Sequence, residues 1–220
     1  METHTTEDQQ IAAARAWLKQ NGASIVTGVI LGFAALFATR AWFAWQENQA
    51  QMASDLYAVM ISALESGNNQ VVTDRAGKLI AEHSGSGYAA MAALALARVR
   101  IEEGQLEGAR ANLQWVLDNS NVDYLRDTAR LRLAHVLLAL DDTDGAMQVL
   151  DQAGAGQTRS PLVAELMGDI HRARGEQQQA QQAYQEALAG RGDEYPGRQL
   201  LQIKYQDTLG AAAAGAGTVQ

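Results

Sequence analysis

The feature that most restricts the fold of this chain is an apolar stretch near its start, residues 22–45, with the sequence GASIVTGVILGFAALFATRAWFAW. Between Lys19 and Arg40 there are 20 consecutive residues without an ionisable side chain. As an α-helix rising about 1.5 Å per residue, these residues would cross the roughly 30 Å hydrocarbon core of a bilayer once. The sequence therefore predicts a transmembrane helix over residues 21–45, preceded by a cytoplasmic N-terminal segment, residues 1–20.

Two other interpretations of this stretch fit less well. A buried core helix would carry polar residues every three or four positions, but only Ser24 and Thr27 interrupt the run before Thr39. A cleaved signal peptide would have a shorter apolar region and a small-residue cleavage site. The run instead closes with residues typical of an interfacial anchor: Arg40, Trp42 and Trp45. A permanent membrane anchor is favoured.

The positive charges beside the predicted span indicate its orientation. Arg15 and Lys19 lie on the N-terminal side, against Arg40 alone on the other. Because positively charged flanks are retained in the cytoplasm, we expect a single-pass membrane protein whose N-terminus stays in the cytoplasm and whose large C-terminal domain is exported.

A stripe of small residues inside the span suggests a second role for it. Gly28 and Gly32 form a GxxxG pair, and Ser24 extends the stripe by one helical turn. Small residues at this spacing let another helix approach closely, so this stripe is a candidate membrane helix interface. Glycine is also common in membrane helices that have no such partner, and the sequence leaves both interpretations open.

Composition excludes several classes of function. The chain carries 17 Lys and Arg against 25 Asp and Glu, a net charge of −8, and the acidic excess follows residue 45. Such a surface repels phosphate backbones, so nucleic-acid binding is not expected. Without cysteine, neither a disulfide framework nor a thiolate zinc site can form. Two prolines and many good helix formers predict a mostly helical protein.

Three segments after the span resemble one another: residues 93–117, 130–153 and 164–188. Each has a small residue in a first helix, a turn seven residues later, an alanine twelve residues after the small residue, and a large apolar residue four further on. The small residues are Ala97, Ala134 and Gly168; the alanines are Ala109, Ala146 and Ala180; the large residues are Leu113, Leu150 and Tyr184. The alanines are 37 and then 34 residues apart.

This spacing resembles the tetratricopeptide repeat, a helix hairpin with a period of 34 residues. The small residue would let the second helix cross the first closely, and the large residue would fill the space between hairpins. Gly104 and Gly175 fit a turn that needs positive φ, and Asp141 with Asp142 would serve in the middle repeat. We expect that middle turn to be looser.

The predicted fold is all-α, with one N-terminal transmembrane helix followed by a tetratricopeptide-repeat-like right-handed helix-hairpin solenoid over residues 46–209. We place repeats near residues 50–83, 90–119, 127–153 and 161–189. The first is degenerate, with Leu64, Gly67, Ala76 and Ile80 in the corresponding places and extra residues in its turn. A capping helix over 197–209 would face inward with Leu200, Ile203 and Leu209. The low-complexity tail, residues 210–220, is predicted to be disordered.

Catalytic chemistry is not indicated. No phosphate-binding loop, nucleophile elbow or HExxH motif occurs, and the four histidines form no pattern with carboxylates at metal-ligand spacing. We therefore predict a non-enzyme without catalytic residues, cofactor or metal.

A stack of helix hairpins offers a curved surface for protein contacts. The candidate concave protein-binding surface is apolar in two repeats and charged in the third, which suits an extended or amphipathic protein segment. Its positions on the first helices are Leu94, Arg98, Ile101, Leu131, His135, Leu138, Glu165, Asp169 and Arg172. A solvated surface, or one partly covered by the capping helix, remains the alternative.

The chain resembles the bacterial YfgM family, the ancillary subunit of the SecYEG translocon. The segments that carry the resemblance are NGASIVTGVILGFAALFATRAW, YAAMAALALARV, LRLAHVLLAL and ELMGDIHRARGEQQQAQQAYQEAL. The resemblance implies a single-pass protein of the bacterial inner membrane, with the N-terminus cytoplasmic and the C-terminal domain periplasmic. It also implies association with Sec translocon subunits and with PpiD, a membrane-anchored periplasmic chaperone, and assistance to newly exported proteins. An envelope scaffold or regulator with one dedicated partner, such as a signalling or cell-envelope assembly protein, is the alternative function.

Overall fold

The structure, a computed structural model, describes residues 3–152, 160–190 and 197–216, with side chains described from residue 9 to residue 210 within those ranges. Regular secondary structure in these ranges is helical. The helices are α1 (Thr3–Glu65), α2 (Asn69–Glu82), α3 (Gly87–Glu102), α4 (Leu106–Asn119), α5 (Asp123–Ala139), α6 (Thr143–Asp151), α7 (Pro161–Ala173), α8 (Gln177–Ala189) and α9 (Arg198–Ala216). The chain divides into two units, Met1–Met52 and Ala53–Gln220.

The first unit is formed by the greater part of α1. Its large apolar side chains are largely exposed, and Ile30, Leu31 and Phe37 are all more than half exposed. Within the described residues, the segment Gln9–Glu65 is the one helix long and apolar enough to cross a membrane, with a window of mean hydropathy 1.9 that is entirely unburied. An exposed apolar surface of this size needs an apolar environment, which a lipid bilayer provides.

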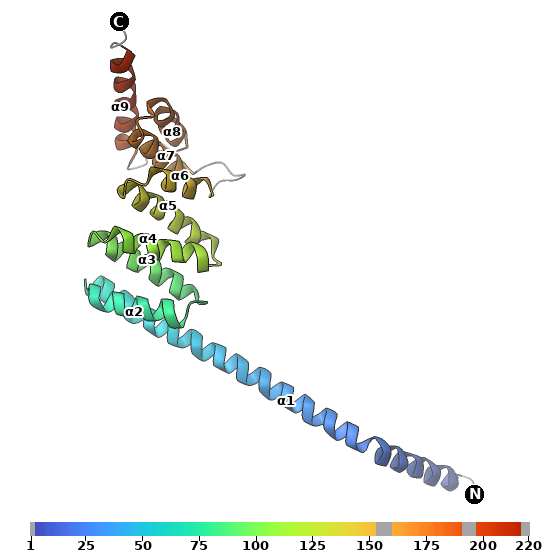
Figure 1. Cartoon of the computed structure of the whole chain (residues 1–220). Helices are drawn as coiled ribbons and strands as arrows, with labels where there is room; N and C mark the ends of the chain where they lie inside the picture. Colours follow the sequence, from blue (N-terminus) through green and yellow to red (C-terminus); the bar gives the residue numbers. More distant parts are fainter. Residues whose placement is uncertain (1–2, 153–159, 191–196, 217–220) are drawn as a thin grey trace. The chain divides into compact units, whose positions relative to one another are not determined.

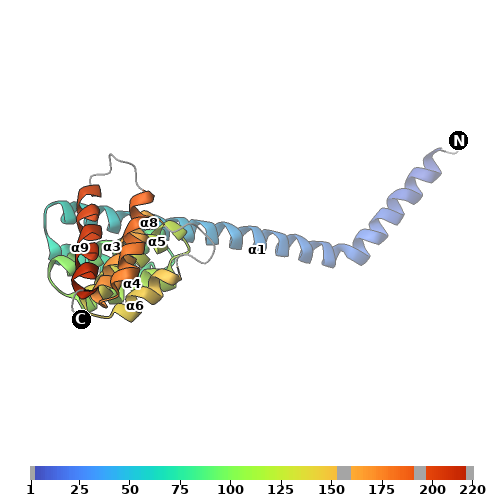
Figure 2. The ribbon, with the colours of Figure 1, turned by 90° about the horizontal axis from the view of Figure 1, so that it is seen from above.

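The second unit is a stack of helix hairpins. Its members are the end of α1 from Ala53 with α2, then α3 with α4, α5 with α6, and α7 with α8, followed by α9 (Figure 1). From α2 to α9, helices that follow one another in the chain pack together, and the first helices of neighbouring hairpins also touch, α3 with α5 and α5 with α7. The end of α1 shares a buried cluster with α2. Figure 2 shows α2–α9 from above, overlying one another in this stack. The predicted all-α solenoid of tetratricopeptide-like hairpins is confirmed.

The same tight turn joins the two helices of every hairpin. Its central residue has positive φ, at Gly67 (72°), Gly104 (74°), Asp141 (61°) and Gly175 (76°). The N–H of the residue after this central residue donates a hydrogen bond to the carbonyl five residues earlier, for example from Asp142 to Leu137 (2.9 Å). The turns at Gly104 and Gly175 make the same bond, and so does the turn at Gly67, which has no extra residues.

Aspartate therefore replaces glycine in the middle hairpin without loosening the turn, contrary to our expectation. Asp141 adopts the left-handed conformation that aspartate tolerates better than most residues. Asp142 then caps α6, because its carboxylate accepts a hydrogen bond from the Gly145 N–H (2.9 Å).

The repeat positions predicted from the sequence form the core. The small residues, the alanines and the large residues of all three segments are buried. In the last hairpin the small and large residues meet directly, because a Cβ added at Gly168 would lie 2.4 Å from Cε1 of Tyr184. The small residue thus provides the space that the large residue fills.

The first hairpin uses the same positions with the sizes reversed. Counting from the turn at Gly67, Met60 occupies the place of Ala97 and Ala76 occupies the place of Leu113, and both are fully buried. Our assignment of Ala76 and Ile80 to the alanine and large positions was wrong by four residues, because it allowed extra residues in the turn at Gly67, which the turn does not contain. The two positions together fill one space, so either order packs.

The final helix differs from its prediction in two ways. It faces inward with Leu201 and Thr208, which are buried, and with half-buried Tyr205. Leu200, Ile203 and Leu209, predicted to face inward, are instead 58%, 48% and 42% exposed. The helix also continues to Ala216, beyond the predicted end at residue 209, because alanine has the highest helix propensity. Residues 217–220 of the predicted disordered tail lie outside the described residues.

Candidate protein-binding surface

The predicted binding residues come from one helix of each of three hairpins, α3, α5 and α7. On α3, Leu94 is buried and Ile101 is 39% exposed. Arg98 is exposed and forms an ion pair with Glu102 (2.8 Å) one helical turn later on the same helix. This part of the surface therefore offers one exposed apolar residue beside a partly neutralised charge.

On α5, the binding positions combine apolar and titratable side chains. Leu131 and Leu138 are half-buried, whereas His135 is exposed. Partial burial of its ring lowers the pKa of His135, and the positive charge of Lys204 lowers it further, while the carboxylates of Asp169 and Glu165 raise it. These influences place His135 in the electrostatic field of both α7 and α9.

On α7, the two acidic positions share one cation from α9. The Nζ atom of Lys204 lies 3.0 Å from Oε1 of Glu165 and 2.8 Å from Oδ2 of Asp169. All three side chains are less than one-fifth exposed. Partial burial makes these contacts stronger than surface ion pairs, and loss of Lys204 would leave two carboxylates close together.

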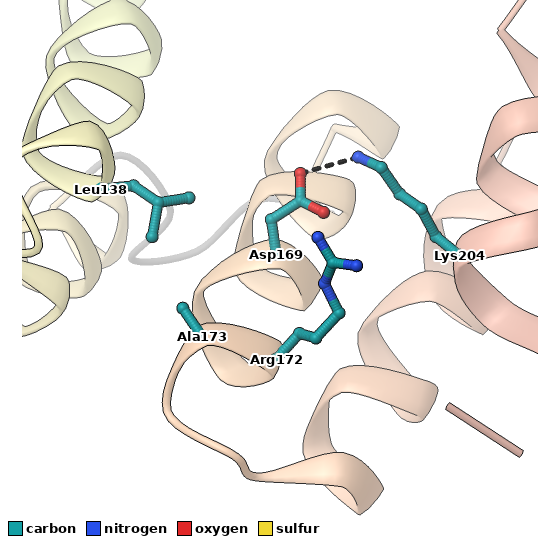
Figure 3. A pocket seen from close by; sticks show the side chains of 5 residues that line it. All are labelled: Leu138, Asp169, Arg172, Ala173 and Lys204. Carbon is teal, nitrogen blue, oxygen red and sulfur yellow. Dashed lines mark hydrogen bonds and ion pairs between the residues drawn. The ribbon is translucent and has the colours of Figure 1, made fainter. Parts of the chain in front are cut away.

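A pocket of about 550 Å³ opens beside this charge cluster. It is lined by Leu138 of α5, by Asp169, Arg172 and Ala173 of α7, and by Lys204 of α9. Figure 3 shows Lys204 reaching across to Asp169, Arg172 one turn along from Asp169 on the same helix, and Leu138 facing them from α5. Arg172 is exposed. The pocket thus combines an apolar wall with fixed charges of both signs.

Tyr184 holds the carboxylate of Asp169 from the other side. Its hydroxyl donates a hydrogen bond to Oδ1 of Asp169 (2.8 Å), and the residue is fully buried. Burial raises the pKa of Tyr184, and the hydrogen bond to Asp169 raises it further, so the hydroxyl keeps its proton and remains a donor. Asp169 is therefore held in place by contacts to two helices, α8 and α9.

Comparisons with known proteins agree with this architecture. A family model described as a tetratricopeptide repeat-like domain matches residues 15–210. The ancillary SecYEG translocon subunit of Escherichia coli (strain K12) is 31% identical over 208 residues, which cover 94% of this chain and 98% of that protein. The subunit of the same name from Haemophilus influenzae is 30% identical over 181 residues, 82% of this chain and 88% of that protein.

The chain belongs to the family of ancillary SecYEG translocon subunits. Solved structures show the fold alone. The MamA protein has a TM-score of 0.56 at 14% identity, over 76% of this chain and 96% of that chain. A putative kinesin light chain with TPR-like repeats from Podospora anserina has a TM-score of 0.55 at 15% identity, over 76% of this chain and 89% of that chain.

Ancillary SecYEG translocon subunits form a non-catalytic family, which confirms the prediction that the chain is not an enzyme. The histidines fit this assignment. His171 pairs with Glu176 across the turn between α7 and α8 (2.5 Å), and His83 is buried at the end of α2. Among the described residues, no three His, Asp or Glu side chains gather where they could hold a metal ion.

Two residues of the charge cluster beside the pocket, Lys204 and Tyr184, were not predicted from the sequence to belong to the candidate binding surface. Lys204 lies in the final helix, 39 residues from Glu165, and no spacing rule joins the two. Tyr184 was recognised as a core residue, but its hydrogen bond to Asp169 was not. One signal could have indicated this ion pair: the predicted capping helix contains a lysine, and the repeat that it covers has two carboxylates among its predicted surface positions.

The residues predicted to form the membrane helix interface and the interfacial anchor are all exposed on α1. Ser24, Gly28 and Gly32 lie four residues apart on one face, and space is open around both glycines. Arg40, Trp42 and Trp45 follow about two to three and a half helical turns after Gly32, and the two indole rings are 5.4 Å apart. The stripe and the aromatic pair remain predictions for a membrane environment.

Proposed function

We propose that this protein is a non-catalytic, membrane-anchored interaction module associated with the Sec translocon, where it assists periplasmic chaperones with newly exported proteins. The observation that carries the proposal is the similarity to ancillary SecYEG translocon subunits over 94% of the chain, which includes both the apolar helix and the repeats. The anchor would keep the repeats beside the export site and raise their effective concentration there.

We infer a topology in which the N-terminus is cytoplasmic and the repeat unit periplasmic. The support is the excess of positive charge before the span, with Arg15 and Lys19 both exposed on α1. Protease added to spheroplasts should digest the repeats while leaving the N-terminal segment intact. Complete protection of the repeats in spheroplasts, with digestion after lysis, would reverse the orientation.

The surface formed by α3, α5 and α7 is our candidate for contact with partner chains. Exposed Ile101 and half-buried Leu131 and Leu138 offer apolar contacts, and Arg172 offers an exposed charge beside the pocket. Exported polypeptides and a PpiD-type chaperone are the partners we propose for it. Such a mixture suits segments that are both apolar and charged.

Two experiments test the proposal. Affinity purification of the full chain after mild detergent extraction should recover translocon subunits, and recovery of none from well-expressed protein would refute the association. Photocrosslinkers placed at Ile101, His135 and Arg172 in intact cells should capture exported chains or a periplasmic chaperone. A crosslinker at exposed Lys78 on α2 is the control, and equal capture there would show that the proposed surface is not the binding surface.

One observation favours the alternative of an envelope scaffold with a dedicated partner. The ion pair of Asp169 and Lys204 gives the pocket a defined arrangement of charges, which suits one particular ligand better than many unfolded chains. Saturable binding of a single folded envelope protein, abolished by Arg172→Glu, would support this alternative. Crosslinks to many different exported proteins would support the first function instead.

A further inference from the structure

A second pocket lies between α4, α5 and α6, with a volume of about 370 Å³, within the range typical of ligand sites. Three arginines line it: Arg110 from α4, and Arg126 and Arg130 from α5. We call this pocket the arginine groove. Such a concentration of guanidinium groups is notable in a chain whose net charge is −8.

The groove lies on a different face of α5 from the surface discussed above. Its residues on this helix, from Arg126 and Arg130 to Leu133 and Leu137, follow each other at spacings of three and four and so share one face. Leu131, His135 and Leu138 do not line it. The groove is therefore a separate site, and what it binds does not depend on the function proposed above.

Much of the hydrogen-bonding capacity of the three arginines is unused. Arg110 is exposed and has no hydrogen-bond or ion-pair partner among the described residues. The buried Nε of Arg126 makes no hydrogen bond within the described part of the chain, and its Nη1 lies 3.9 Å from the largely exposed Asp123. Arg130 is paired with Asp127 (2.6 Å). Two of the three guanidinium groups can therefore take an external anion.

The acidic residues of the groove already have other partners. Asp118 accepts a hydrogen bond from the side chain of Gln114 (2.8 Å). Asp142 caps α6 through the Gly145 N–H (2.9 Å). Neither carboxylate forms an ion pair with the groove arginines, so the guanidinium groups still attract an incoming anion.

The remaining lining favours a peptide over a simple anion. Leu133 and Leu137 are buried beneath the groove, and Leu117 and Val149 are half-buried beside them. Gln148 and Gln152 are exposed along one side and have amide groups that can both donate and accept. An extended peptide has apolar side chains for half-buried Leu117 and Val149 and backbone groups for the amides, and acidic side chains complement the arginines.

We propose that the arginine groove binds an extended acidic segment of a partner protein, whose carboxylates pair with Arg110 and Arg126. The phosphates of a nucleic acid would also pair with the arginines, but the net charge of −8 repels a long polyanion more strongly than a short acidic segment. The glutamines and the leucine floor would have no role in binding phosphate alone.

The test uses the full chain in nanodiscs of uncharged lipid and a fluorescein-labelled peptide of alternating glutamate and leucine. Fluorescence anisotropy should show saturable binding that weakens with salt. The same peptide with glutamine in place of glutamate should bind at least about tenfold more weakly. The glutamate peptide should lose affinity for the Arg110→Glu variant by the same factor. Because Arg110 is exposed and has no described partner, this change should leave the fold intact.

The matched control is Arg132→Glu. Arg132 is an exposed arginine of α5, the helix of Arg126 and Arg130, and it does not line the groove, so its replacement makes the same charge change elsewhere. Binding that falls equally in both variants, or that the glutamine peptide retains, would overturn the proposal. Absence of peptide binding, with retention of anionic vesicles that Arg110→Glu abolishes, would also overturn it and assign the groove to phosphate.

Discussion

At the scale of single residues, Gly168 of α7 packs closely against the ring of Tyr184 of α8. The tyrosine ring occupies the space where a Cβ would be, so the glycine is required by its neighbour and not by its backbone angles. The same tyrosine holds Asp169 and, through it, Lys204. A packing contact in the core thus helps to set the charges at the candidate binding pocket.

Replacing Gly168 with alanine should destabilise the protein by about 1–3 kcal/mol, because the added methyl group overlaps the Tyr184 ring and overpacks the core. Thermal or urea unfolding of the repeats measures this loss. The double variant Gly168→Ala with Tyr184→Leu recreates the alanine and leucine pair of the two preceding hairpins and should recover part of it.

The control for this change is Gly77→Ala. Gly77 lies inside α2, and an added Cβ would have no neighbour within 4 Å. This variant should be unchanged or more stable by up to about 1 kcal/mol, because alanine is the better helix former. A similar loss in both variants would show that the contact with Tyr184 is not the cause.

His135 reports on the charge cluster. Its pKa should lie below the usual value of about 6.5, chiefly because of partial burial. Lys204→Met removes a positive charge and should raise that pKa, whereas Asp169→Asn removes a negative charge and should lower it. Titration of the labelled histidines by NMR measures both shifts, and equal directions in the two variants would contradict the arrangement.

The lowered pKa also gives the sign of a pH effect. The folded state favours the neutral imidazole, so folding is supported above the usual pKa of about 6.5 and loses this contribution as the pH falls through the lowered folded pKa. His135→Gln should remove that part of the acid sensitivity. The effect should be small, because His135 is exposed and solvent screens its charge.

At the scale of elements, the turn between the two helices of a hairpin sets where the first helix ends and the second begins. The positive φ of the four turn residues ends the first helix, and the next residues start the second. At Asp141 the sequence provides a residue that tolerates this angle instead of glycine, which has no penalty for it.

We expect stability to follow the order glycine, aspartate, alanine at position 141. Asp141→Ala should cost about 1 kcal/mol, because alanine lacks the local polar contacts that make the left-handed conformation tolerable, while Asp141→Gly should be neutral or slightly stabilising. Equilibrium unfolding compares the three proteins. Asp142→Ala tests the cap separately and should cost about 1 kcal/mol through loss of the bond to Gly145. Equal stability of all three proteins at position 141 would contradict this explanation of the turn.

The sequence predicted these elements well where the signal is local. Gly104, Gly175 and Asp141 identified the turns, and the spacing of small and large residues identified three hairpins. Prediction from the sequence failed where a residue's position or contacts depend on partners far away in the chain. Nothing local shows that Met60 and Ala76 exchange sizes, that Leu201 and not Leu200 meets α8, or that Lys204 pairs with Glu165.

At the scale of the whole molecule, the second unit is held together by contacts between neighbouring helices. Leu201 of α9 belongs to one buried cluster with residues of α7 and α8, including Ala164 and Tyr184, and no described residue of the earlier hairpins belongs to this cluster. Stability in such stacks is approximately a sum of repeat and neighbour contributions, so damage at one end should remain local.

Leu201→Ala should therefore weaken the C-terminal end of the stack without unfolding the rest. We expect a local loss of about 2–5 kcal/mol from the removed apolar contacts and the remaining cavity. Hydrogen exchange followed by mass spectrometry should become faster in α7, α8 and α9 and stay unchanged in α3 and α4. Faster exchange throughout α2–α9 would show a single cooperative unit instead.

The paired positions of the hairpins also limit the order in which such a protein can change during evolution. To pass from an alanine and leucine pair to the glycine and tyrosine pair at Gly168 and Tyr184, the smaller residue must change first. Glycine opposite leucine leaves only a small void, whereas tyrosine opposite alanine collides. Ancestral forms of this hairpin should accordingly have acquired their glycine before their tyrosine.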